Sequence, residues 1–275
     1  MSKKKKTVFI AVWLVLIVAL TVGAIIAPAA ASGEKESIKD AMKDAVLHGL
    51  NKVDFFGLEV NPAVISGFIL TGMLLLFAAA VRIFAIPSFK EVPGKFQTVI
   101  ESAVGFFDNL AKTNSPRRNS FLGAYLFGAG SYIFIGTIFE LFGIEAVTTE
   151  GLPISLPAPL SDINAAIMMG FLSYGVILGG GLVGNGIKGV GGALKDFSLP
   201  VSMSFRLFGA LLSGALVTEL VYHYINLSFV LPVAVGVLFT LLHALIQTYV
   251  LTMLTSVFYG EAAERKPKNK KQAKA

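Results

Sequence analysis

Apolar residues occur in six long runs, and polar residues gather between these runs and at the two ends of the chain. Each of the last five runs is long enough to cross, as a helix, the roughly 30 Å of hydrocarbon in a bilayer. Glycine and proline within them are compatible with helices, because neighbouring helices satisfy the freed backbone groups. The pattern predicts five core transmembrane helices, near residues 62–86, 119–143, 161–184, 198–225 and 229–258.

The first apolar run follows a basic start. Lys3 to Lys6 precede an apolar stretch that ends in the small residues Ala29 to Ala31. Residues 1–31 are therefore either a cleaved signal peptide or an uncleaved signal-anchor helix, and the pattern is typical of both. Residues 32–60 form a separate N-terminal segment of mixed charge ahead of the membrane domain, 61–264.

A different pattern separates the first two core runs. Apolar residues recur there at helical spacing, while Lys95, Glu101 and Asp108 lie between them. This pattern predicts an amphipathic helix that lies at the membrane surface. The apolar positions are Phe96, Val99, Ile100, Ala103, Val104 and Phe107.

Composition supports a membrane protein. Hydrophobic residues make up 55% of the chain, charged residues only 15%, and the mean hydropathy is +0.73. These values favour an all-α integral membrane protein in a lipid bilayer over a soluble domain. The net charge of +6 does not indicate a nucleic-acid partner, because the basic residues cluster at the ends and in short loops. With no cysteine, the chain has no disulfide, thiolate or cysteine-based metal site.

The distribution of lysine and arginine predicts the orientation. The loop between the first two core runs, the Gly-rich loop near Lys188 and Lys195, and the tail 265–275 are all basic. The loop before residue 162 has no lysine or arginine. The positive-inside rule places the basic segments, including the C-terminus, in the cytoplasm and residues 32–60 outside. We interpret the tail as a solvated end rather than a lipid-specific site.

One charge lies deep inside an apolar run. In "LPVSMSFRLFGALLSGALV", residues 199–217, Arg206 is about ten residues from the cytoplasmic start of its helix, or roughly 15 Å. A charge at mid-membrane costs roughly 2.5–3.5 kcal/mol on insertion scales. Arginine remains charged, and no carboxylate lies one turn away. Arg206 therefore requires a polar partner, a water-filled cavity or another subunit.

Other polar residues concentrate in the last two runs. Glu219 and His223 are four residues apart, on one helix face near the outer end. They form either an aqueous pocket that passes protons or an interfacial pair that ends the span. Gln247 shares the depth of Arg206, so a hydrogen bond between them is plausible. His243 lies one turn further out, as a pocket residue or as a packing residue.

The remaining motifs are structural or absent. Asp162 and Asn164 begin the third core run, where an N-cap role alone explains Asp162. "GGGLVGNGIKGVGG" lacks the end of a phosphate-binding loop and predicts a turn with close helix packing. We find no hydrolase constellation, cofactor motif or metal site, and no internal repeat. The charges describe an ion path that lacks a mid-membrane carboxylate.

Five segments together resemble one family. "SMSFRLFG" closely resembles the signature around the essential arginine of subunit a of F-type ATP synthases, and "LIQTYVLTMLTSVFYGE" resembles the last helix of that subunit. "PLSDINAAI", "VPGKFQTVIESAVGFFDNL" and "HGL…FFGLEVNPAVI" are similar to three of its earlier segments. The matches follow the family order over residues 46–264.

The resemblance implies a function. Subunit a is a stator subunit with two offset half-channels, and the missing carboxylate belongs to the neighbouring c-subunit ring. Arg206 would face that carboxylate, with Gln247 beside it, on a tilted C-terminal helix hairpin. We assign the ion path to Glu219, His223, His243, Asp162 and Asn164. Other expected partners are the peripheral-stalk b subunits and the F1 sector. The chain itself would be non-enzymatic and cofactor-free, and would lie in a bacterial cell membrane.

Departures from the family pattern concern the outer half-channel. Ala210 stands where the family usually has asparagine, and Ala215 and Thr240 stand where many members have titratable groups. Three alternatives stay open: a sodium-translocating version of the same subunit, an independent secondary transporter, and a structural membrane anchor. Ion choice is set largely by the c-subunit, so this chain does not decide it.

Overall fold

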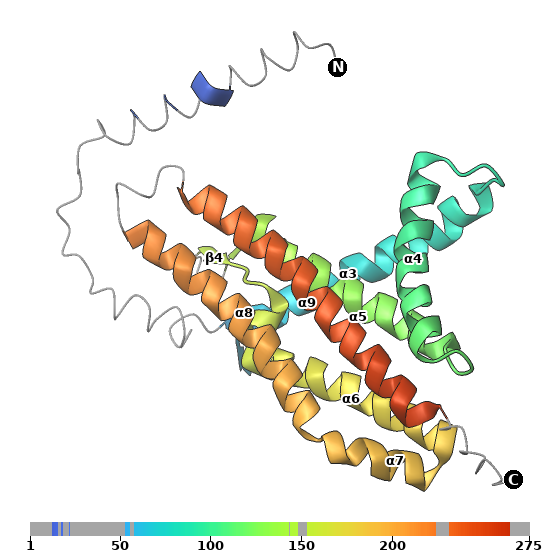
Figure 1. Cartoon of the computed structure of the whole chain (residues 1–275). Coiled ribbons are helices and arrows are strands. Elements are labelled where there is room, and N and C mark those ends of the chain that lie inside the picture. Colours follow the sequence, from blue (N-terminus) through green and yellow to red (C-terminus); the bar gives the residue numbers. More distant parts are fainter. Residues whose placement is uncertain are drawn as a thin grey trace, which may run out of the picture.

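Long helices form most of the structure. The computed structural model describes residues 13–15, 18, 22, 53–55, 58–142, 144–147, 153–223 and 231–264. Its main helices are α3 (Pro62–Ala80), α4 (Lys95–Asn114), α5 (Ser120–Phe139), α6 (Ile163–Asn185), α7 (Ile187–Ala193), α8 (Ser198–His223) and α9 (Leu231–Ala263). A π-helical turn, Val81–Ala85, and a 3-10 turn, Ile86–Ser88, extend α3. In Figure 1, α8 and α9 lie side by side as a long antiparallel hairpin.

Four of the predicted spans are confirmed as helices. Among the described residues, four helical segments are long and apolar enough to cross a membrane, namely Pro62–Ser88, Ser120–Phe142, Ile163–Asn185 and Val235–Ala263. The remaining predicted span corresponds to α8, a helix of 26 residues that is not among these four. Residues 1–12 and the tail from 265 lie outside the described part, as does most of 16–52.

The described residues form an all-α membrane protein, as predicted, with two short β-hairpins beside the helices. β1 (Val53–Phe55) pairs with β2 (Leu58–Val60), and β3 (Glu145–Val147) pairs with β4 (Pro153–Ser155), both antiparallel. The second hairpin lies between the end of α5 and the start of α6. Backbone groups that leave a helix still require partners, and these three-residue strands supply them where no helical periodicity exists.

The amphipathic segment is confirmed as helix α4. Phe107 and Ala111 are buried, and the ring of Phe107 fills the space beside Gly130 of α5. On the polar side, Gln97 donates to Glu101 at 2.7 Å, and Lys112 forms an ion pair with Asp108. The position of α4 at a membrane surface stays a prediction.

Helix α9 is the centre of the packing. It contacts α4, α5, α6, α7 and α8. Small residues make this possible, because a Cβ on Gly184 would overlap the backbone of Ala263 and one on Gly260 would overlap the backbone of Asn114. The Gly-rich segment therefore packs closely, as predicted. Its turn occurs at Gly186, whose φ of 62° is a conformation that side chains disfavour.

The helix ends form two separate groups. At one end, the Asn61 side chain donates to Asp162 at 2.9 Å and joins the start of α3 to the start of α6. At the other end, Asn185 donates to the carbonyl of Ala262 at 2.8 Å, so α6 and α9 end together. Helices that cross a membrane in alternating directions would place their ends in two such groups. The cytoplasmic assignment of the second end remains a prediction.

Candidate functional site

Arg206 lies on the side of α8 that the described part of the chain leaves uncovered. Met203, Ser204 and Leu207 are buried, whereas Arg206 is exposed. In the described part of the chain, Arg206 forms no ion pair with a carboxylate. The helix has therefore turned its apolar face toward its neighbours and its charge away from them. The polar partner that the sequence requires for Arg206 is not found in this region.

Small polar residues accompany Arg206 on that face. Ser202, Gly209 and Ser213 are exposed, and with Arg206 they follow helical spacing along one side of α8. Ser213 donates its hydroxyl to the carbonyl of Ala210 at 2.8 Å. A Cβ at Gly209 would meet no atom within 4 Å. This face, which we call the Arg206 face, therefore leaves room for another helix to approach the charge.

Gln247, unlike Arg206, lies on a buried surface. Its side chain is 8% exposed, on the face of α9 that packs into the helix bundle. No hydrogen bond joins Gln247 to Arg206 in the described structure, although α8 and α9 are in contact. Equal depth in the membrane did not imply a contact, because the two side chains leave their helices in different directions. The hydrogen bond that the sequence made plausible is therefore not formed among the described residues.

His243 has local contacts. Its Nδ1 lies 2.8 Å from the carbonyl oxygen of Phe239, and its ring stacks on the ring of Phe239 with centroids 5.6 Å apart. A carbonyl oxygen only accepts, so Nδ1 is the donor in this bond. The ring is half-buried. His243 is thus held in one orientation by the bond and by its stacking on Phe239, and Nε2 is the ring nitrogen that this bond does not use.

The other predicted site residues lie near the first group of helix ends or outside the description. Asp162 is the N-cap of α6, and it accepts from the backbone N–H groups of Asn164 and Ala165. Asn164 is exposed in the first turn. Glu219 and His223 belong to α8, which confirms their common helix, but their side chains lie outside the described atoms.

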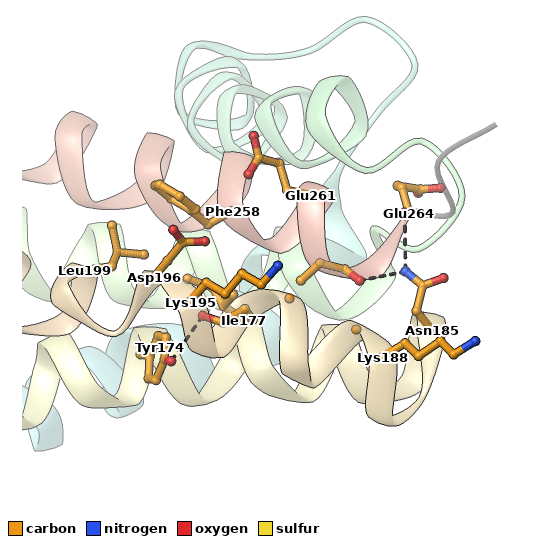
Figure 2. Close-up of a pocket in the computed structure, with 14 residues that line it drawn as sticks. Tyr174, Ile177, Asn185, Lys188, Lys195, Asp196, Leu199, Phe258, Glu261 and Glu264 are labelled. Carbon is orange, nitrogen blue, oxygen red and sulfur yellow. Dashed lines mark hydrogen bonds between the residues drawn. The ribbon is translucent and has the colours of Figure 1, made fainter. Parts of the chain in front are cut away.

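A cavity of about 690 Å³ opens at the second group of helix ends. Figure 2 shows charged side chains around it: Lys188, Lys195 and Asp196 from the segment that includes α7, and Glu261 and Glu264 at the end of α9. Asn185 donates to the backbone of Ala262 there, and the hydroxyl of Tyr174 donates to the carbonyl of Ala193 at 3.2 Å. We call this the charged cavity.

The charged cavity and Arg206 share helix α8. Leu199 lines the cavity, and Arg206 follows it by seven residues. Seven residues are about two turns, or roughly 10.5 Å, and return to nearly the same face of a helix. The cavity therefore opens at the cytoplasm-assigned end of the face that carries Arg206. Sequence reasoning missed Asp196 and Glu261, because their apolar neighbours along the chain gave no sign of a shared cavity.

Metal chemistry has no support in the described region, where no three His, Asp or Glu side chains converge. The arrangement instead combines a fixed cation on an open helix face, buried polar side chains on α9 and a charged cavity at one end. A family model described as the ATP synthase A chain matches residues 64–260, well over half of the chain. The chain therefore belongs to this family, as the multi-pass, ion-transporting subunit a that acts with the c-ring in the membrane sector of F-type ATP synthase.

Proposed function

We propose that this subunit forms two offset half-channels that carry protons to and from the carboxylates of the c-ring, and so couples proton flow to rotation and ATP synthesis. The observation that carries the proposal is the position of Arg206, a permanent cation on an uncovered helix face. Membership of the family implies a neighbouring c-ring, whose carboxylates would face Arg206. The chain contributes no nucleotide chemistry of its own.

Arg206 acts as the electrostatic barrier between the half-channels. A guanidinium in a low-dielectric region attracts a deprotonated c-ring carboxylate strongly, and five N–H donors allow it to bind both carboxylate oxygens. Its charge also repels a free proton or hydronium ion that would cross directly. The exposed Gly209 beside it lets the ring helix come close. The insertion cost of Arg206 is thereby offset by a partner outside this chain.

The charged cavity is the cytoplasmic half-channel in this proposal. Asp196 and Glu261 line it and provide carboxylates that can accept protons from a ring carboxylate and release them to water. Lys188 and Lys195 hold the opposite charge at the same opening, which limits the accumulation of other cations. Leu199, on the path toward Arg206, is apolar and separates the water of the cavity from the fixed charge.

The outer half-channel is formed from the other end of the α8–α9 hairpin. Glu219 and His223, one turn apart, pass a proton inward, and Nε2 of His243, the ring nitrogen not bonded to Phe239, is the next acceptor. Gln247 orients the group that approaches Arg206 once the ring is in place. Asp162 and Asn164 form the polar rim, where Asp162 also holds the start of α6.

Rotation follows from these parts. A proton enters from outside, neutralises a ring carboxylate, travels with the ring and leaves through the charged cavity. The b subunits hold this stator against the F1 sector, where ATP is made. The C-terminus is cytoplasmic, in a bacterial cell membrane, in agreement with the basic end of the chain.

The test measures ATP-driven proton and sodium uptake by membrane vesicles that contain the whole complex. Arg206→Ala is compared with Arg82→Ala, which removes an exposed arginine from the α3 span. Coupled pumping is lost only in Arg206→Ala, while assembly and ATP hydrolysis remain. Normal pumping by Arg206→Ala refutes the proposal. Uptake of sodium in place of protons identifies the sodium-translocating alternative.

A further inference from the structure

A long groove runs along an exposed face of α6, and Tyr259 of α9 lines one edge of it. It has a volume of about 840 Å³. Eight residues of α6 line it at intervals of three and four, from Met168 to Val183, which is one continuous helix face. From Met168 to Val183 the helix rises by fifteen residue steps, or roughly 22 Å, more than the roughly 15 Å of hydrocarbon in one leaflet. The groove is therefore long enough for an extended acyl chain.

Glycines that have no side chain form the floor of the groove. A Cβ at Gly175 or Gly179 would meet no atom within 4 Å, in contrast to Gly180 and Gly184, where it would overlap α9. A glycine inside a helix costs about 0.5–1 kcal/mol relative to alanine. At Gly180 and Gly184, close packing against α9 explains why the residue is glycine. At Gly175 and Gly179, no contact within the described chain explains the absence of a side chain.

The walls are apolar and uncovered. Phe121 of α5 and Met168, Leu172 and Val183 of α6 are each more than half exposed. Such a surface is suited to hydrocarbon. Apolar walls alone would describe any lipid-facing surface, so the groove is distinguished by what lies at its end.

The end of the groove carries two arginines. Arg117 and Arg118 line it together with Ser120, the first residue of α5. Arg118 donates to the carbonyl of Val183, which holds its guanidinium at the rim with further N–H donors remaining. Glu264 accepts from the backbone N–H of Arg117, so its carboxylate fixes the loop, and Arg117 itself is exposed.

The start of α5 adds further donors. Its N-cap residue, Asn119, turns its side chain back to the carbonyls of Ser115 and Pro116 and makes no capping bond. The first N–H groups of a 20-residue helix thus stay available beside the two arginines. This combination of donors matches a phosphate group.

We propose that the Arg117–Arg118 groove binds one anionic phospholipid of the cytoplasmic leaflet. The phosphate lies against Arg117, Arg118, Ser120 and the start of α5, and one acyl chain lies along α6 over Gly175 and Gly179. This goes beyond the proton path, because the charged cavity and the groove have no lining residue in common. The bound lipid would fill the space between α5 and α6 and stabilise the loop that joins α4 to α5.

The test uses the purified, delipidated ATP synthase complex, reloaded from vesicles with equal amounts of phosphatidylglycerol and phosphatidylcholine. After washing, retained lipids are counted by mass spectrometry. In the double variant Arg117→Gln/Arg118→Gln, we expect the enrichment of phosphatidylglycerol at this subunit to fall about tenfold, because charge-assisted hydrogen bonds are lost. Lys90→Gln/Lys95→Gln removes equal charge from the first residue of α4 and the loop before it, and keeps the wild-type ratio. Unchanged enrichment in the arginine variant overturns the proposal.

A second variant leaves the charge unchanged. Gly179→Leu places a side chain in the groove where there is room for it, and retained phosphatidylglycerol falls. Gly72→Leu is the matched control, since its Cβ also meets no atom and it does not line the groove. A photo-crosslinking residue at position 172 of the whole complex should form lipid adducts. A crosslink to another subunit would show that a protein occupies the groove and would refute the lipid site.

Discussion

Two polar stripes on neighbouring helices have opposite surroundings. On α9, Thr252 and Thr255 are fully buried, and their hydroxyls donate to backbone carbonyls one turn earlier. On α8, Arg206 and Ser202 are exposed on a face that the chain does not cover. The hydroxyl groups of the buried stripe find their hydrogen-bond acceptors within α9, so neighbouring helices can pack closely against it. The exposed stripe has a charge without an ion pair in the described chain, so it depends on a partner. A buried polar side chain in a membrane span thus indicates bonding within its own helix, whereas an exposed charge indicates a partner outside it.

The largest effect should come from the exposed stripe. Arg206→Lys retains a positive charge, but a lysine loses its proton readily when desolvated, so the barrier to direct proton passage weakens. Coupled pumping should fall at least about tenfold, equivalent to about 1.4 kcal/mol. Proton uptake by vesicles measures it. Ser202→Ala, on the same face, should pump normally. Wild-type coupling in Arg206→Lys would mean that charge alone is sufficient.

Close glycine contacts should come next. Gly184→Ala forces a methyl group against the backbone of Ala263, which cannot move as a side chain can. Overpacking of this kind costs about 1–3 kcal/mol. The temperature at which the solubilised complex releases this subunit should therefore fall. Gly128→Ala, at an exposed position of α5 with open space around it, should leave that temperature unchanged or raise it. Equal effects of the two variants would contradict the packing of α6 on α9.

The cap of α6 should give a smaller effect. Asp162→Ala removes two backbone hydrogen bonds at the helix start and the bond from Asn61. Loss of a cap costs about 0.5–2 kcal/mol. Asn164→Ala, at an exposed position, is the control. Thermal release of the subunit measures both. If pumping falls in Asp162→Ala while thermal stability is normal, Asp162 takes part in proton transfer beyond its structural role.

The smallest expected effect is a difference in stability between substitutions of two threonines on the buried side of α9. Among the described residues, the Thr248 hydroxyl is buried without a hydrogen bond, whereas Thr252 donates to the carbonyl of Thr248 at 2.7 Å. Thr248→Val removes an unpaired polar group and should stabilise the complex by about 1 kcal/mol. Thr252→Val should be neutral or slightly destabilising. If Thr248→Val destabilises the complex, its hydroxyl has a partner in the assembly.

Local patterns allowed much of this architecture to be predicted. Long apolar runs indicated the spans, helical spacing from Phe96 to Phe107 indicated α4, and Asp162 was recognised as a cap because an N-cap depends on its nearest neighbours. The three-residue strands have no periodicity that a pattern could reveal.

Features that depend on rotation or on distant contacts were not predictable. Depth along a helix follows from counting residues, but the direction of a side chain follows from tertiary packing. Equal depth made a bond between Arg206 and Gln247 plausible, and the described structure has none. The charged cavity joins Asn185 to Glu264, which are 79 residues apart. Nothing in either local sequence indicates the other.

The hydrogen bond between Asn61 and Asp162 has a consequence for the order of synthesis. The two residues are 101 positions apart, so the bond forms only after the start of α6 has left the ribosome. Until then, α3 must remain in the bilayer without it. Helix α3 is equipped for this, because Asn61 also caps it locally through the N–H of Ala63, and no charged residue interrupts Pro62–Ala80. The start of the first core span is thus joined to the start of α6 only two spans later, whereas its contacts with α5 are available one span later.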